Sequence, residues 1–165
     1  MSERIFSFPI SAEHVQVDVA FIGCIEPRFW NAHPENGLST IDAFMRDQGW
    51  TFVPLTSAGG IKVLVSENPA DVPQKESLLF RIGQELDLHH PRIIAASVHK
   101  DCGAYGYSAA FDNDTAKESN QLQEDLRKAE DILKEKFGSR VEEIRLFTFD
   151  FEGVEEFKVL EVVTV

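Results

Sequence analysis

The sequence RIIAASV at residues 92–98 is a short run of branched and small apolar side chains. A run of this kind is typical of a β-strand that is buried on both faces of a parallel sheet. Residues 16–25 contain a second such run, which reads VDVAFIGCI after a glutamine. The two stretches therefore predict two buried strands of one mainly parallel sheet.

Helical patterns alternate with strand patterns along the rest of the chain. Further strands are predicted at residues 50–55, 61–65, 143–150 and 157–163, and helices at residues 39–48, 76–88 and 115–137. The alternation predicts a single α/β domain over residues 1–165, with a mainly parallel central sheet flanked by helices. The last two strands are predicted to form an antiparallel edge hairpin that turns near residues 152–153. The charged residues of the helix at 115–137 are interpreted as its solvated face.

The charge and the hydrophobic pattern of the chain limit the kinds of partner that it can bind. The chain carries 28 acidic and 16 basic residues among 165, so its net charge is -12. This balance argues against nucleic acid or an anionic membrane as the main partner, because both require a basic surface. No apolar run approaches the roughly 20 residues that span a bilayer, and residues 1–10 lack the features of a secretion signal. We therefore expect a cytoplasmic protein without a membrane partner.

The chain has two cysteines, Cys24 and Cys102, which lie far apart in the sequence. Two cysteines exclude a disulfide scaffold, although they leave a single disulfide open. Burial in the core is the ordinary alternative for such residues. A redox pair is another, although no Cys-x-x-Cys motif is present. In a reducing compartment, metal or redox chemistry explains them better than a structural disulfide does.

Cys24 ends the first buried strand, and His99 and Cys102 follow the strand at residues 92–98. Residues beyond the carboxyl ends of parallel strands line a shared crevice, so these three side chains are expected to meet there. The His-x-x-Cys spacing turns both side chains inward, and Gly103 permits the bend. Two thiolates and one imidazole suit zinc rather than magnesium or calcium, and catalytic zinc typically keeps one open position. We therefore predict that Cys24, His99 and Cys102 bind one zinc ion.

Glu26 and Arg28 alternate with Cys24 in the sequence Cys24-Ile25-Glu26-Pro27-Arg28. This spacing can direct both charged side chains toward the region of Cys24. A carboxylate and a guanidinium that pair beside zinc can orient a water molecule on the metal. An ordinary surface ion pair is the alternative interpretation.

The two motifs together resemble those of the β-class carbonic anhydrases. That family has a Cys-x-Asp-x-Arg segment, which corresponds to Cys24, Glu26 and Arg28, and a later His-x-Asp-Cys-Gly segment, which corresponds to residues 99–103. Residues 50–60, which end in Ser-Ala-Gly-Gly, are similar to the strand and loop between the two metal segments of the family. The likeness is clear over about residues 16–110.

The resemblance implies a zinc enzyme that hydrates carbon dioxide to bicarbonate by means of zinc-bound hydroxide. It implies that Cys24, His99 and Cys102 bind the metal, and that Glu26, held by Arg28, accepts a hydrogen bond from the hydroxide and orients it. It also implies at least a homodimer. Carbonyl sulfide and carbon disulfide would require the same attack by hydroxide, so they are alternative substrates.

The sequence departs from the family at several positions. Glu26 replaces the family's aspartate and is one methylene longer, and Ser57 stands where the family usually has a loop asparagine. The early position of Cys24 implies that the N-terminal helical arm of many members is missing, and the spacing of the motifs suggests an insertion near residues 31–40 or 61–75. The alternative function is a zinc-binding protein with little hydratase activity, in which Glu26 closes the fourth zinc position and the role is structural or regulatory.

Overall fold

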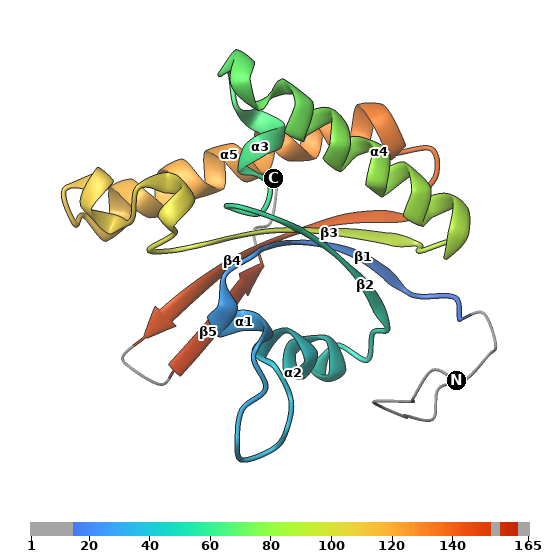
Figure 1. Ribbon diagram of the computed structural model, residues 1–165, viewed down its shortest axis with the longest axis horizontal. Coiled ribbons are helices and arrows are strands. Elements are labelled where there is room, and N and C mark those ends of the chain that lie inside the picture. Colours follow the sequence, from blue (N-terminus) through green and yellow to red (C-terminus); the bar gives the residue numbers. More distant parts are fainter. Residues whose placement is uncertain (1–14, 153–155, 162–165) are drawn as a thin grey trace, which may run out of the picture.

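The computed structural model describes residues 15–152 and 156–161, which form a five-stranded sheet with helices on both faces (Figure 1). The strands are β1 (Val19–Cys24), β2 (Phe52–Ser57), β3 (Ile93–His99), β4 (Glu143–Glu152) and β5 (Glu156–Glu161). Their order in the sheet is β2-β1-β3-β4-β5. The strands β1 to β4 are mutually parallel, whereas β5 pairs with β4 in the antiparallel sense. The predicted α/β fold with a mainly parallel sheet is therefore confirmed.

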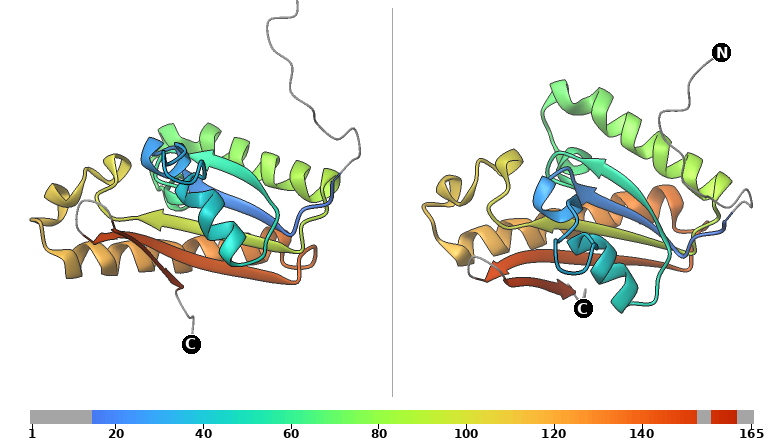
Figure 2. Two further views of the ribbon diagram at one scale, coloured as in Figure 1. Left: turned by 90° about the horizontal axis from the view of Figure 1, so that it is seen from below. Right: turned by 60° about the horizontal axis from the view of Figure 1, so that its bottom comes forward.

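The helices form a layer on each face of the sheet (Figure 2). One face is covered by α3 (Lys62–Val65), α4 (Val72–Leu88) and α5 (Thr115–Phe137). The opposite face is covered by α1 (Pro27–Trp30) and α2 (Thr40–Asp47). Among the described residues, no helix combines the length and the apolar character that crossing a membrane requires.

Each helical layer packs on a separate hydrophobic core. Aliphatic side chains dominate the core beneath α3, α4 and α5, where Ile22, Ile82 and Leu126 are fully buried. Aromatic side chains dominate the core beneath α1 and α2, where Phe21 and Phe149 are fully buried. Because β1 and β3 contribute to both cores, their residues are buried on both faces, as their apolar sequences predict.

Local capping signals explain where two of the helices begin. Ser39 caps α2 by accepting a hydrogen bond from the backbone of Asp42, and the Asp42 side chain accepts one from the Ser39 backbone in return. Asp114 caps α5, because its carboxylate accepts hydrogen bonds from backbone N–H groups of the first helical turn. The helices predicted at these two places are confirmed.

The prediction of a strand at residues 61–65 is wrong. Gly59 and Gly60 follow β2 with positive φ angles of 75° and 62°, and they turn the chain out of the sheet. The next residues form the short helix α3, in which Val63 and Leu64 are buried. A short apolar run does not distinguish a buried strand from a buried helical turn, so the sequence pattern alone is ambiguous here.

The other predicted elements are present with shifted ends. α4 begins at Val72 rather than at residue 76, because a 3₁₀ turn at Pro69–Asp71 leads directly into it. β4 extends past the predicted end to Glu152. The last predicted strand corresponds to β5, but residues 162–163 and the predicted turn at Gly153 lie outside the described residues.

The interpretation of the α5 charges as a solvated face is wrong for three carboxylates. Glu118, Asp125 and Glu130 are buried, with exposed fractions of 3%, 7% and 6%. The loop between β3 and α5 folds over Glu118 and Asp125 and donates hydrogen bonds to both, and Glu130 forms an ion pair with Lys134. The sequence marks these side chains as polar, but only the tertiary fold shows that they are covered.

Candidate metal centre

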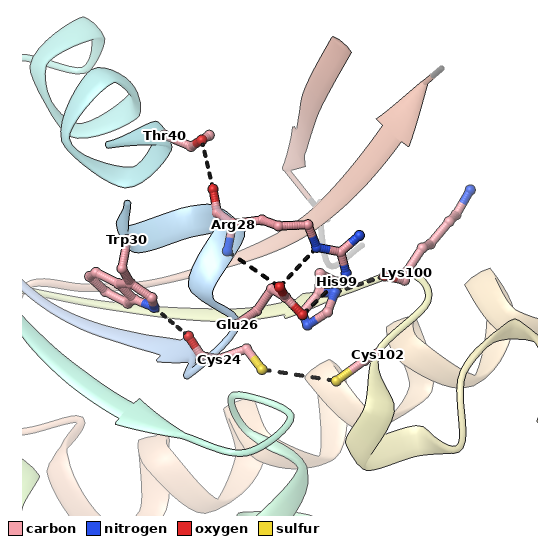
Figure 3. Close-up of polar contacts among 8 residues, drawn as sticks. All are labelled: Cys24, Glu26, Arg28, Trp30, Thr40, His99, Lys100 and Cys102. Atoms are coloured by element: carbon pink, nitrogen blue, oxygen red, sulfur yellow. Dashed lines mark hydrogen bonds and ion pairs between the residues drawn. The ribbon is translucent and has the colours of Figure 1, made fainter. Parts of the chain in front are cut away.

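Three potential metal ligands meet at the carboxyl end of the parallel sheet. β1 and β3 are adjacent parallel strands, so Cys24 and His99 at their ends reach the same edge of the sheet. Cys102 lies in the turn that follows β3, and Figure 3 shows its sulfur facing that of Cys24. The ligand atoms of the three side chains lie within 4.8 Å of one another, and all three residues are buried. The fold thus brings together the predicted trio, and the cluster could hold a metal ion.

The imidazole of His99 has one nitrogen occupied and one available. Nδ1 lies 2.7 Å from the carbonyl oxygen of Lys100, and a carbonyl can only accept, so Nδ1 carries the proton. Nε2 is then the nitrogen with the free lone pair, yet it is buried without a hydrogen-bond partner among the described residues. Buried polar atoms are nearly always paired. An unpaired nitrogen beside two sulfurs fits a metal ligand, whose other ring nitrogen is typically held by a carbonyl in this way.

The two thiols form a close but unbonded pair. Their sulfur atoms are 3.9 Å apart, which exceeds a disulfide bond length of about 2.05 Å, and both cysteines are free. The pKa of Cys24 is lowered well below its ordinary value, first by a hydrogen bond with Cys102 and further by His99 and by the backbone N–H of Gly59. The same contact raises the pKa of Cys102, which keeps the shared proton. Cys24 is therefore poised to bind a cation as a thiolate, the form that metal sites require.

The glycine turn at residues 59–60 supports the thiolate. The N–H of Gly59 donates a hydrogen bond to the Cys24 sulfur over 3.3 Å. The next residue, Gly60, packs against β3, and a Cβ atom at that position would lie 2.1 Å from the carbonyl oxygen of Ser97. Because glycine lacks Cβ and tolerates a positive φ, it is the residue that this close approach requires. The Ser-Ala-Gly-Gly loop therefore belongs to the support of the site.

Glu26 and Arg28 form a two-pronged ion pair next to the cluster (Figure 3). Arg28 Nε and Nη2 lie 2.8 and 3.1 Å from the two carboxylate oxygens of Glu26. α1 holds the pair in place, because Glu26 also accepts the backbone N–H of Arg28 and Pro27 occupies the first turn. Among the described residues, the group that could hold a metal consists of the two cysteines and His99. The Glu26 carboxylate thus faces Arg28 and lies outside the ligand cluster.

An aromatic stack also contacts Arg28. The guanidinium carbon lies 4.5 Å from the centroid of the Phe151 ring, which is a cation–π distance. Phe151 stacks on Phe29 with ring centroids 5.3 Å apart, and Phe29 meets the His99 ring edge-on at 4.9 Å. Sequence reasoning missed both rings. Phe29 could have been found because it directly follows Arg28, whereas Phe151 lies in β4 and has no local signal.

An apolar recess lies beside the cluster, between the sheet and the helices α1 and α2. Its walls include Cys24 and His99 together with Phe21, Phe29, Trp30, Ile41, Val98 and Phe149. Trp30 is held there by a hydrogen bond from its Nε1 to the carbonyl oxygen of Cys24, over 2.7 Å. The recess is too narrow for a water molecule, and its walls belong mostly to the packed aromatic core beneath α1 and α2.

The protonation of Glu26 provides a direct test of the ion pair. Its pKa is lowered from the ordinary value of 4.5, mainly by the hydrogen bonds from the Arg28 side chain. Arg28→Ala removes the donors that stabilise the ionised carboxylate, so the pKa of Glu26 is expected to rise toward that ordinary value. A ¹³C NMR titration of the Glu26 carboxyl carbon measures the change.

The control for this titration is Lys128→Ala. Lys128 pairs with Glu124 on α5, which lies on the opposite face of the sheet from α1. Its removal should leave the pKa of Glu26 where it is in the original protein. If Arg28→Ala also leaves that pKa unchanged, the ion pair does not exist in solution.

Comparison with known proteins identifies no relative from which a function could be inferred. No protein-family model matches the chain, and no curated protein matches it significantly. The donor set and the geometry of the cluster are therefore the basis for a function.

Proposed function

We propose that this protein is a zinc-dependent hydratase that converts carbon dioxide and water to bicarbonate and a proton, in the manner of the β-class carbonic anhydrases that its motifs resemble. The observation that carries the proposal is the buried cluster of Cys24, His99 and Cys102, in which His99 Nε2 lacks a partner among the described residues. The Glu26–Arg28 pair beside the cluster supplies a carboxylate that can orient a water molecule.

Zinc is the metal that the donor set favours. Two thiolates and one imidazole disfavour magnesium and calcium, which prefer oxygen ligands. Catalytic zinc sites typically have three protein ligands, whereas structural sites have four. Within the described part of the chain, no fourth cysteine, histidine or carboxylate joins the cluster, which supports a catalytic site. When bound, zinc would supply the Lewis acidity that makes hydroxide available from water near neutral pH.

Glu26 and Arg28 would position the reacting water. The Glu26 carboxylate is anchored at both oxygens by Arg28, and its lowered pKa keeps it ionised at neutral pH. A carboxylate oxygen has two lone pairs, so Oε2 can accept an O–H of water in addition to the Arg28 Nη2–H. Fixing one O–H in this way would direct the remaining lone pair of the water toward the substrate.

The alternative function, in which Glu26 closes the fourth metal position, requires a different position of the Glu26 side chain. The Glu26 carboxylate would have to leave Arg28, with which it forms the two contacts described above. Its extra methylene gives it the reach for such a movement. Carbonyl sulfide and carbon disulfide are small, nonpolar and linear like carbon dioxide, and they would require the same attack by hydroxide.

The proposal is tested by stopped-flow hydration of carbon dioxide with zinc-loaded protein between about pH 6.5 and 9. The original protein is expected to exceed a Cys24→Ala control, which has lost a metal ligand. Activity no higher than that control at any pH would overturn the hydratase function. Assays with carbonyl sulfide and carbon disulfide on the same protein decide among the substrates.

Glu26→Gln is expected to lower the hydration rate by about 10–100-fold while zinc stays bound, because the amide cannot replace an ionised acceptor. Glu26→Asp introduces the residue of the resembled family and should keep most of the activity. Zinc K-edge X-ray absorption on the same variants reports the number of ligands. Loss of an oxygen ligand in Glu26→Gln, without loss of activity, would favour the closed site instead.

The resemblance also leads us to propose at least a homodimer. Size-exclusion chromatography with light scattering measures the molecular mass, for which one chain contributes 18.6 kDa. A mass of one chain at all accessible concentrations would contradict it.

A further inference from the structure

The loop that carries Cys102 is anchored to α5 by two buried carboxylates. It connects β3 to α5 and contains two short 3₁₀ turns, Gly103–Tyr105 and Ser108–Phe111. Glu118 and Asp125 lie about two helical turns apart, so they are on one side of α5 and both contact this loop. Neither belongs to the ligand cluster found among the described residues. Their contacts with the loop therefore need an explanation other than direct metal binding.

Glu118 receives hydrogen bonds from the loop on both sides of Cys102. Its Oε1 accepts the backbone N–H of Asp101 over 2.7 Å, and its Oε2 accepts the hydroxyl of Ser108 over 3.0 Å. Asp101 in turn accepts the backbone N–H of Ser108 over 3.2 Å. Asp101, Ser108 and Glu118 form a closed ring of hydrogen bonds, and Cys102 lies between the first two in the sequence. Because Glu118 is buried, water does not compete for these bonds.

The backbone at Asp101, directly before Cys102, has an uncommon conformation. Its φ angle is 51°, in the left-handed region, which residues other than glycine adopt uncommonly, although aspartate does so more often than most. The following residue is Cys102, whose carbonyl oxygen accepts the backbone N–H groups of Tyr105 and Tyr107 over 3.0 and 2.9 Å. If Asp101 relaxed to a negative φ, the direction of the Cys102 side chain would change with it.

Asp125 holds the second part of the loop. Its Oδ2 accepts the hydroxyl of Tyr105 over 3.0 Å, and its Oδ1 accepts the side-chain amide of Gln121 over 2.9 Å. The Tyr105 ring also receives the ammonium of Lys62, 5.1 Å from its centroid. The loop is thereby fixed to α3 as well as to α5. Of these contacts, the one made by Glu118 lies nearest to Cys102, because it involves the preceding residue, Asp101.

We propose that Glu118 is a positioning residue of the metal site. By holding Asp101 in its left-handed conformation, it places the Cys102 sulfur where it can share a metal with Cys24 and His99. This inference rests on the metal site of the proposed function, but it does not depend on the reaction performed there. The competing explanation is that Glu118 only stabilises α5, since an acidic residue in the first turn favours a helix.

Glu118→Ala tests the proposal through metal binding. We expect the zinc dissociation constant to rise by about 10–100-fold, the typical effect of removing a residue that orients a metal ligand. In the cobalt-substituted protein, the sulfur-to-cobalt charge-transfer absorption should weaken, because Cys102 no longer has a fixed geometry. Glu118→Gln keeps an acceptor oxygen for the Asp101 N–H, and its amide can donate to the Ser108 hydroxyl. It should therefore recover part of the affinity, and it decides the question if Glu118→Ala does not fold.

Glu130→Ala is the matched control, since Glu130 is another buried carboxylate of α5, and its partner is Lys134 rather than the loop. It should change stability without changing zinc affinity or the cobalt spectrum. If both Glu118 variants behave like this control, the positioning role is overturned. A Cys102→Ser variant that binds zinc as tightly as the original protein would instead overturn the metal site itself, so the two failures are distinguishable.

Discussion

Replacing Cys102 with serine is expected to raise the zinc dissociation constant by about a hundredfold to a thousandfold. A serine hydroxyl does not ionise at neutral pH, so the site would keep only one thiolate and one imidazole. Zinc sites with four ligands bind with about 10–16 kcal/mol, so one ligand is worth roughly 2.5–4 kcal/mol. Each 1.4 kcal/mol corresponds to a factor of about ten in the dissociation constant. Competition with a chelator of known affinity measures the loss.

His33→Ala is the control for this variant. His33 is an exposed histidine whose Nε2 lies 3.2 Å from the hydroxyl of Thr40, and it takes no part in the ligand cluster. Its replacement should leave zinc binding unchanged. A reduced original protein that binds no zinc, or a Cys102→Ser variant that binds it equally well, would contradict the assignment of the ligands. Carbon dioxide hydration should follow the zinc content across these variants.

Gly60→Ala is expected to reduce the free energy of unfolding by about 2–5 kcal/mol. The left-handed backbone conformation costs alanine about 1–2 kcal/mol. The added Cβ would lie 2.1 Å from the Ser97 carbonyl oxygen, and the backbone shift that relieves such overpacking costs about 1–3 kcal/mol more. Because the same turn supplies the Gly59 N–H to the Cys24 sulfur, zinc affinity should fall in this variant as well.

Gly37→Ala separates the conformational cost from the steric cost. Gly37 has a φ angle of 70°, but nothing lies within 4 Å of a Cβ placed there. The Gly37→Ala variant should therefore lose only about 1–2 kcal/mol of its free energy of unfolding. Urea denaturation of the zinc-free proteins measures both variants, because a bound metal would stabilise the folded state and mask the difference. Equal destabilisation would show that Gly60 does not approach Ser97 closely in solution.

The features that sequence reasoning predicted well have local signals. β1 and β3 are buried on both faces, and a strand in that environment needs a continuous apolar run. Parallel strands end at a common edge, so the positions of Cys24 and His99 after two such runs were enough to predict that they meet. The pairing of Glu26 with Arg28 also follows from their spacing, because it involves one short turn.

The features that it missed depend on contacts between distant segments. Residues 61–65 read as a strand, and the turn before them leaves the sheet because Gly60 packs against Ser97 of β3. Phe151 supports Arg28 from a strand more than a hundred positions away in the sequence. Glu118 looks like an ordinary surface carboxylate until the loop from β3 covers it.

By itself, the sequence determined the α/β class and which residues are candidates for the metal site, because both depend on residue types at strand and turn spacing. Only the tertiary structure decided the surroundings of those residues: His99 Nε2 without a partner among the described residues, Glu26 facing Arg28, and Glu118 beneath the loop. The physical reason is that burial and hydrogen-bond partners are set when separate segments close on one another. In an extended chain, water would satisfy the Asp101 N–H and the Glu118 carboxylate separately, and they find each other only when the loop folds onto α5.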